Sequence, residues 1–176
     1  MKSNKLRNLS FFAVGIVILI GLLQFIPKTQ TPQSEPQVVN KESDRWKKIL
    51  TPEQYHVLRE GGTDVPFTHQ DMLNNHEKGT YVTADCDEPV FRSEDKFDSG
   101  TGWPSFTKPI SEDAVVLKTD TTLGMERVEV LGKRCGGHLG HVFDDGPLTL
   151  PDGRQGTGRR YCINASALKF VPDKEK

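Results

Sequence analysis

The sequence is short of cysteine and has almost no excess charge. Three cysteines occur among 176 residues, and no two of them form a C-x-x-C pair. The dithiol centre typical of a general thiol-disulfide exchange protein is therefore missing. Lysine and arginine total 23 against 24 acidic residues, so no basic surface for nucleic acid is indicated. Internal repeats and low-complexity tracts are also missing.

Segments with a helical period are few. Sixteen glycines and 11 prolines are scattered along the chain, which is typical of many turns between short strands. One short helix is expected at 51–59, because Thr51 suits an N-cap and Pro52 the first helical position. We therefore predict a mainly β domain. Strands are expected near 79–82, 89–91, 114–118, 126–131, 135–143 and 160–168, with a long loop at 144–159.

The one long apolar run lies near the N-terminus. Residues 9–26 carry no charge, and three basic residues precede them. Such a run can span a bilayer, which takes roughly 17 to 25 helical residues, and the preceding positive charge predicts that the remainder lies outside the cytoplasm. We expect an uncleaved signal anchor over 1–29, since no small-x-small cleavage site follows. Secretion after signal cleavage is the alternative, and a buried core helix fits the flanking sequence poorly.

The segment after this run is polar. Residues 30–45 are rich in Thr, Gln, Ser, Glu and Pro, and such a composition lacks the apolar residues needed for a core. We expect a disordered linker there. The folded domain is then expected to cover 46–172, followed by a tail at 173–176.

Cys162 lies near the start of a predicted strand, after the Gly- and Arg-rich loop 152–159. Arg159 and Arg160 come just before it, and neighbouring positive charge favours the thiolate, which is the reactive form of cysteine. A small buried apolar residue, the usual state of a free cysteine, is the alternative.

Two histidines follow Cys135 at spacings of three, His138 and then His141. The intervening glycines argue against a helix, and residues three apart in a strand face opposite sides. A metal held by all three residues is therefore not expected. Histidines near a cysteine are better suited to positioning and protonating a substrate oxygen, because histidine titrates near neutral pH. Satisfied surface histidines are the alternative.

Trp103 lies in a loop between Gly102 and Pro104. Its indole can present a flat apolar wall that suits a methyl or thioether group. A core tryptophan is the alternative.

Three segments together resemble the signature blocks of the B-type peptide-methionine (R)-S-oxide reductases. They are FDSGTGWPSF (97–106), CGGHLGHVFDDGP (135–147) and GRRYCINASALKF (158–170). The resemblance implies two antiparallel sheets in a small barrel-like or tent-like domain with short N-terminal helices. It also implies thiol-dependent reduction of methionine-R-sulfoxide in oxidised proteins or peptides, which repairs them. A non-catalytic β-fold binding module and, less favoured, a thiol-disulfide exchange protein remain alternatives.

The resemblance also implies roles for individual residues. Cys162 matches the nucleophile that becomes a sulfenic acid, His141 the group that protonates the sulfoxide oxygen, and His138 its partner. Trp103 and Phe143 match the wall that receives the ε-methyl group. The polar residues expected around the nucleophile are Asp145, Arg160 and Asn164.

Two departures from the family pattern concern the other cysteines and Thr101. Many relatives hold a structural zinc with two C-x-x-C pairs, and the matching positions here are Thr83, Cys86, Gly132 and Cys135. A closed zinc site needs four ligands, so we expect no metal and propose a Cys86–Cys135 disulfide in its place. Thr101 stands where many relatives carry a resolving cysteine. We therefore expect a thioredoxin-like partner outside the cytoplasm to reduce the sulfenic acid.

Overall fold

The computed structural model describes residues 38–174 of the chain. Its α-helices are α1 (Val38–Ile49), α2 (Pro52–Glu60) and α3 (Gln70–Leu73). The strands among the described residues are β1 (Gly79–Thr83), β2 (Pro89–Arg92), β3 (Lys96–Phe97), β4 (Ser105–Phe106), β5 (Val115–Asp120), β6 (Arg127–Gly132), β7 (His138–Phe143), β8 (Arg160–Ile163) and β9 (Leu168–Pro172). Short 3-10 turns are η1 (Ser93–Asp95), η2 (Glu112–Ala114), η3 (Thr122–Gly124) and η4 (Ala165–Ala167).

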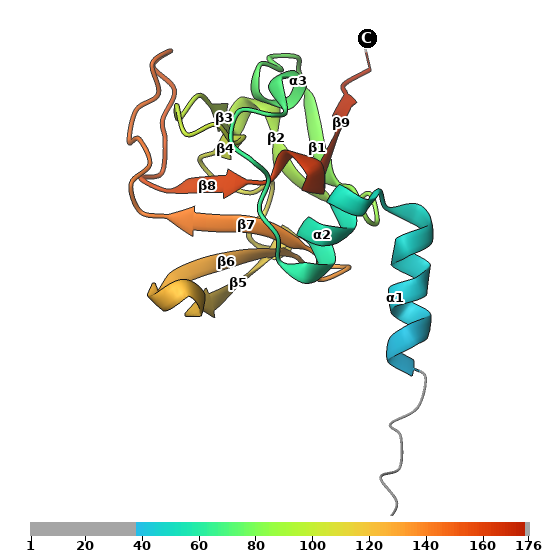
Figure 1. Ribbon diagram of the computed structural model, residues 1–176. Coiled ribbons are helices and arrows are strands. Elements are labelled where there is room, and N and C mark those ends of the chain that lie inside the picture. Colours follow the sequence, from blue (N-terminus) through green and yellow to red (C-terminus); the bar gives the residue numbers. More distant parts are fainter. Residues whose placement is uncertain (1–37, 175–176) are drawn as a thin grey trace, which may run out of the picture. The chain divides into compact units, whose positions relative to one another are not determined.

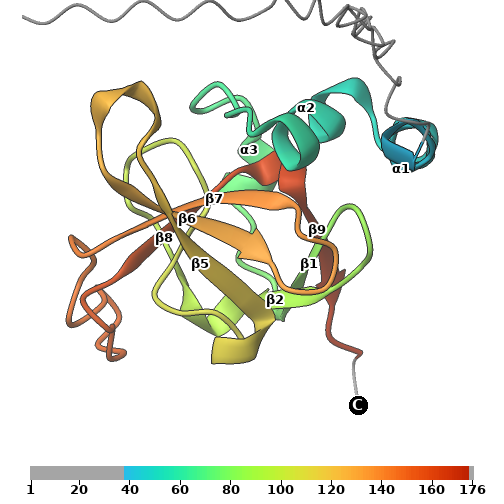
Figure 2. The ribbon, with the colours of Figure 1, turned by 90° about the horizontal axis from the view of Figure 1, so that it is seen from below.

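The strands form two antiparallel sheets, which confirms the predicted fold class (Figure 1). The smaller sheet has the order β2-β1-β9, and the larger has the order β3-β4-β8-β7-β6-β5. In the described part of the chain the sheets stay separate and neither closes into a barrel. The second helix, α2, packs beside β7 and η4, as the view from below shows (Figure 2).

Aromatic side chains from both sheets form the centre of the core. Phe106 of β4 meets Tyr81 of β1 and Phe91 of β2, with ring centroids 5.0 and 4.4 Å apart. Tyr161 of β8 lies 5.9 Å from Phe91 and is also buried. Because successive strand residues point to opposite faces, the neighbours of Tyr161 on β8 point away from this core. Cys162 therefore faces the other side of the larger sheet.

The predicted helix at 51–59 is present as α2, with the expected capping. The Thr51 hydroxyl accepts from the backbone N–H of Gln54, whose side chain accepts from the Thr51 backbone in return. Gly61 ends the helix in the left-handed conformation, at φ 69°. Val57 and Leu58 on the inner face are buried in the core. Capping at both ends thus fixes where the chain leaves α2 for the loop that approaches Cys162.

The helix α1 begins at Val38, inside the segment 30–45 where a disordered linker is expected. Trp46 and Leu50, four residues apart, are buried in the main core. The guanidinium of Arg59 lies 3.8 Å from the centroid of the Trp46 ring, and such a cation–π contact adds to the apolar burial. These tertiary contacts stabilise a helix that the polar composition of the segment does not indicate.

The predicted membrane segment at 9–26 lies outside the described residues. Within 38–174, none of the helices has both the length and the apolar character needed to cross a bilayer.

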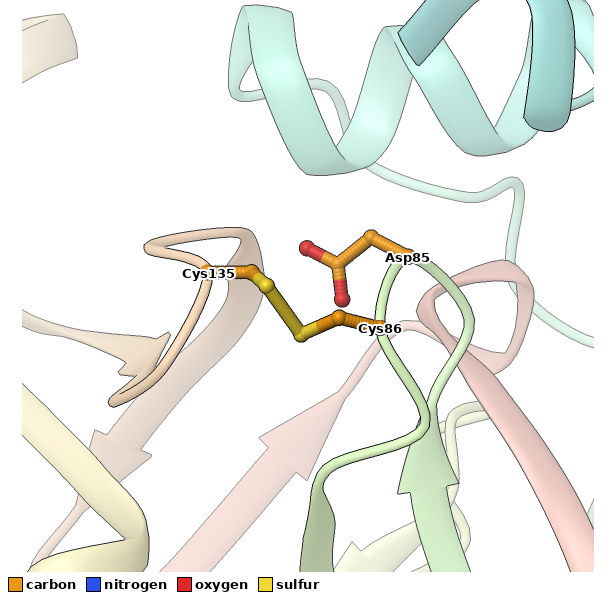
Figure 3. A group of neighbouring side chains, drawn as sticks. All are labelled: Asp85, Cys86 and Cys135. Atoms are coloured by element: carbon orange, nitrogen blue, oxygen red, sulfur yellow. A yellow bond between two sulfur atoms is a disulfide. The ribbon is translucent and has the colours of Figure 1, made fainter. Parts of the chain in front are cut away.

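A cross-link joins two turns at one end of the sheets. Cys86, in the turn between β1 and β2, is bonded to Cys135, in the turn between β6 and β7 (Figure 3). Arg59 of α2 donates to the Asp85 carboxylate at 2.5 Å and to the Cys135 carbonyl at 2.7 Å. The same two turns are therefore held by a covalent bond and by one half-buried cation.

Candidate active site

The strand register places the predicted nucleophile beside the predicted acid. Cys162 of β8 is directly opposite His141 of β7, which in turn is opposite Glu129 of β6. Directly opposed side chains on one face have Cβ atoms about 4.5–5.5 Å apart. Cys162 and His141 are therefore neighbours on the face that points away from the core.

A second row runs parallel to the first. Arg160 is opposite Phe143, and its guanidinium lies 4.5 Å from the centre of that ring. Further along the sheet, Arg127 of β6 is opposite Asp120 of β5. This row therefore brings three charged side chains and one aromatic ring next to Cys162 and His141.

A cavity of about 140 Å³ opens at Cys162. It is lined by Thr63, Trp103, Arg127, Gly140, His141, Phe143, Cys162 and Asn164. Five of the eight predicted catalytic or substrate-binding residues are thus brought together around one small space. The other three, His138, Arg160 and Asp145, stand behind or beside it.

Gly140 provides the close approach between β7 and β8. A Cβ atom there would lie 2.1 Å from the carbonyl oxygen of Cys162 and 3.0 Å from the Cα of Ile163. No side chain fits at that separation, so the backbone itself forms part of the cavity wall.

Cys162 is the free cysteine of the described residues, and it is half-buried. Burial raises the pKa of the Cys162 thiol, because a charged sulfur is poorly solvated there. A hydrogen bond with the Thr101 hydroxyl, at 3.9 Å, and the nearby charge of Arg160 lower that pKa only in part. The resting sulfur is therefore a thiol at neutral pH.

His141 is held by a carboxylate that the sequence analysis does not identify. Its Nε2 lies 2.8 Å from Oδ2 of Asp120. Hydrogen bonds from Thr122 and from His141 hold the pKa of Asp120 well below its usual range, so Asp120 is an acceptor and Nε2 carries the hydrogen. Burial lowers the pKa of His141, and the bond to Asp120 opposes that shift. Arg127 also donates to Asp120, at 2.7 Å.

Trp103 is fixed by the loop that follows α2. Its indole Nε1 donates to the carbonyl of Asp64 at 2.9 Å. The Asp64 backbone N–H donates to Oδ1 of Asn164 at 2.9 Å, and its carboxylate accepts from the backbone and hydroxyl of Ser166. Asn164 in turn donates to the Leu139 carbonyl at 3.1 Å. One buried network therefore sets the position of both the indole and Asn164.

The remaining predicted residues lie farther from the sulfur. His138 is only 7% exposed, and its Nδ1 pairs with Glu129 at 2.7 Å while its ring centre lies 5.4 Å from that of His141. Asp145 is 61% exposed and accepts two hydrogen bonds from Arg160, at 2.9 and 2.8 Å. Asp145 therefore acts on the site through Arg160.

The positions that match a zinc site do not offer a zinc donor set. The Cys86 and Cys135 sulfurs are bonded to each other and so are not thiolates. Gly132 has no side chain, and the Thr83 hydroxyl lies 3.6 Å from the Cys86 sulfur. Asp85 also stands near both sulfurs (Figure 3), but its Oδ2 accepts from Arg59. These residues do not fit a four-ligand zinc site.

Sequence reasoning misses the site residues whose role depends on strand pairing. Asp120, Arg127 and Glu129 lie on the hairpin of β5 and β6. Asp120 ends β5, and the alternation of Arg127 and Glu129 with valines indicates only a polar face. That this face meets His141 and His138 follows from the pairing of β6 with β7. A prediction of how β5, β6 and β7 pair would be needed to identify these three residues from the sequence.

Comparison with known proteins gives one consistent result. Residues 50–172 match the family model described as SelR domain. A peptide methionine sulfoxide reductase MsrB from Methanosarcina barkeri is 52% identical over 139 residues, which cover 79% of this chain and 92% of the relative. Proteins of the same name from Leptospira interrogans and Agrobacterium fabrum are 51% and 52% identical, over 75% and 76% of this chain and 95% and 93% of the relatives.

Proposed function

Because the chain belongs to the SelR-domain family and is a peptide-methionine (R)-S-oxide reductase, we propose that Cys162 is its nucleophile and His141 its proton donor. One observation carries the proposal: both residues line a single cavity together with Trp103. The relatives favour neither a binding module nor a thiol-disulfide exchanger.

The proposed chemistry transfers one oxygen atom to sulfur. The Cys162 thiolate attacks the sulfoxide sulfur, one proton is delivered to the sulfoxide oxygen, and the sulfur–oxygen bond breaks as the hydroxyl group passes to Cys162. The products are methionine and a sulfenic acid on Cys162, so sulfur in the substrate is reduced and the cysteine is oxidised.

The proton is assigned to one nitrogen of His141. Its Nε2 hydrogen is engaged with Asp120, which leaves Nδ1 as the ring nitrogen that can give a proton to the substrate. The carboxylate stabilises the imidazolium that this role requires. Asp120 is therefore proposed as the residue that sets the tautomer and the pKa of His141.

The ε-methyl group is proposed to lie against Trp103 and Phe143. Both rings line the cavity, and an aromatic wall is a favourable surface for a methyl group next to sulfur. The hydrogen bond from the indole to the Asp64 carbonyl keeps Trp103 in place without substrate.

The sulfenic acid is proposed to be reduced by an external dithiol. Thr101 is the residue next to the sulfur, where it cannot form a disulfide, and Cys86 and Cys135 are bonded to each other. A first partner thiol would displace water and form a mixed disulfide with Cys162. A second partner thiol would then release Cys162 as a thiol and leave the partner oxidised, as in a thioredoxin-like protein.

We also propose a membrane-anchored enzyme whose domain acts outside the cytoplasm. The support is the uncharged run at 9–26 with three basic residues before it. In such an oxidising compartment the Cys86–Cys135 bond would replace a zinc cross-link. Secretion after cleavage of the run is the alternative, and the mass of the mature protein distinguishes the two.

The test is an epimer-resolved turnover assay on the purified full chain with dithiothreitol as reductant. Peptide-bound methionine-R-sulfoxide should be reduced and the S epimer should not. The enzyme after a single turnover without reductant should carry one oxygen on the Cys162 peptide, detected by mass spectrometry with a sulfenic-acid trap. A disulfide to Cys162 in that experiment would contradict the external reductant.

A further inference from the structure

Three hydroxyl groups form a continuous chain that ends at the Cys162 sulfur. Ser105 Oγ lies 2.7 Å from Ser99 Oγ, which lies 2.8 Å from Thr101 Oγ1. Thr101 Oγ1 lies 3.9 Å from the Cys162 sulfur. At the far end, the Ser105 hydroxyl donates to the Trp103 carbonyl at 3.2 Å. Of these contacts, the active site described above includes only the one between Thr101 and the Cys162 sulfur.

The backbone holds this chain in place. Ser105 is opposite Cys162 in the pairing of β4 with β8, and it is 0% exposed. Ser99 also accepts from the backbone N–H of Thr101, at 3.4 Å. A buried hydroxyl that loses its partner is costly, so Ser105 in particular is constrained to keep its bonds, and the half-buried Ser99 and Thr101 extend the chain to the sulfur.

Counting hydrogens shows that the chain has two possible directions. Each hydroxyl donates one hydrogen. If Ser105 donates to the Trp103 carbonyl, Ser99 donates to Ser105 and Thr101 donates to Ser99. Thr101 can then only accept from Cys162, which suits a thiol. A thiolate only accepts, so Thr101 must donate to it, Ser99 to Thr101 and Ser105 to Ser99.

We propose that this hydroxyl chain, Ser105–Ser99–Thr101, reverses when Cys162 ionises and so stabilises the anionic sulfur. In the reversed state all three O–H groups point toward the sulfur, and each bond polarises the next. The reversal gives up the bond from Ser105 to the Trp103 carbonyl. The thiol proton leaves to bulk solvent, while the hydroxyl hydrogens only rotate about their C–O bonds.

The inference rests on the proposed role of Cys162 and gives each hydroxyl a role. Thr101 contacts the reacting sulfur directly and Ser99 acts through it as a positioning residue, whereas Ser105 holds the chain in its first direction by its bond to the Trp103 carbonyl. The other charged or titratable groups around the sulfur are Arg160 on its own strand, His141 on β7, Arg127 on β6 and Asp145 in the loop after β7. Because Arg160 is shared with Asp145, its charge alone is a weak stabiliser of the thiolate.

The test measures the pKa of the Cys162 thiol in the purified full chain, from the pH dependence of its alkylation by iodoacetamide, with the Cys162 peptide followed by mass spectrometry. Thr101→Val keeps the shape and removes the hydroxyl. We expect it to raise the thiol pKa by about one unit, which lowers alkylation near neutral pH about tenfold. Thr101→Ser restores the hydroxyl and should return the pKa to within about 0.3 units of wild type.

Ser105→Ala distinguishes reversal from a single fixed hydrogen bond. In this variant the bond from residue 105 to the Trp103 carbonyl is absent from the start. Ionisation of Cys162 therefore no longer has to break that bond. We therefore expect the thiol pKa to fall by about half a unit, opposite in sign to Thr101→Val. Circular dichroism of each variant checks that the domain is folded.

Three outcomes would overturn the inference. They are a Thr101→Val pKa equal to wild type, a Thr101→Ser pKa equal to that of Thr101→Val, and a Ser105→Ala pKa equal to or above wild type. None of these readings depends on turnover. If the pKa shifts appear but the wild-type chain does not reduce methionine-R-sulfoxide, the proposed function fails and the hydroxyl chain stands.

Discussion

Cys162 and the Cys86–Cys135 pair are two sulfur sites in one small domain, and their surroundings differ in kind. Cys162 faces a cavity and is surrounded by a hydroxyl, an imidazole and an indole. The pair joins two turns, where Arg59 contacts both the neighbouring carboxylate and a turn carbonyl. The comparison teaches that the role of a cysteine, reactive or structural, depends more on the residues that the fold brings next to its sulfur than on its neighbours in the sequence.

The largest expected difference between the two sites is in activity. Cys162→Ser should lower kcat/KM for peptide-bound methionine-R-sulfoxide by at least about a thousandfold, because a serine hydroxyl is not ionised at neutral pH. The matched variant with both Cys86 and Cys135 replaced by serine should stay within about threefold of wild type. Steady-state turnover with dithiothreitol measures both, and equal losses in the two variants would break the distinction.

For the free energy of unfolding, we expect the larger loss at the Cys86–Cys135 pair and the smaller loss at Cys162. The disulfide closes a loop with a sequence separation of 49, so the double serine variant should lose about 4 kcal/mol in the free energy of unfolding. Urea unfolding of the oxidised proteins measures this loss. Dithiothreitol should shift the wild-type transition toward that of the variant and leave the variant unchanged. A wild-type transition that ignores reductant would contradict a structural role for the bond.

Asp120→Asn sharpens the description of the Cys162 site. The Asp120 carboxylate raises the pKa of His141, so its loss should lower that pKa further. Catalysis that needs the imidazolium and the thiolate together has a plateau between the His141 and Cys162 pKa values. The acidic limb of kcat/KM should therefore move to lower pH, and the plateau should fall about tenfold for each unit of the shift. Asp113→Asn, at an exposed position, is the control, and an unmoved acidic limb in Asp120→Asn would refute the role.

The smallest effect is expected at Asp145, which is exposed and acts through Arg160. Its charge raises the pKa of Cys162, so Asp145→Asn should lower that pKa slightly. Alkylation of Cys162 near neutral pH should become about two- to threefold faster. A slower rate would mean that Asp145 mainly positions Arg160 against the sulfur.

Local sequence signals predict much of the fold. The capping residues around Thr51 give α2, and the density of glycine and proline indicates short strands in a mainly β domain. The helix α1 escapes prediction, because its stability comes from Trp46 and Arg59, which meet only in the folded state. Composition alone therefore places the start of the helical region too late.

The candidate site also contains residues that the sequence identifies and residues that only the folded structure brings in. Cys162, His141 and Trp103 carry a recognisable motif and meet in one cavity. Arg127 reaches that cavity, and Asp120 reaches His141, only because β5, β6 and β7 pair in one particular register, which no local pattern fixes. The hydroxyl chain to Thr101 depends on the loop between β3 and β4, whose conformation the sequence does not specify.

Position 140 has a consequence for how this active site can vary. The proposed acid, His141, and the proposed nucleophile, Cys162, lie on adjacent strands, and the spacing of these strands is set where Gly140 meets the carbonyl of Cys162. A single extra methyl group there would wedge the strands apart and pull the imidazole away from the sulfur. Random mutagenesis of the cavity should therefore recover active variants at its outer residues but none at Gly140. The separation of the two strands depends on the absence of a side chain at that position.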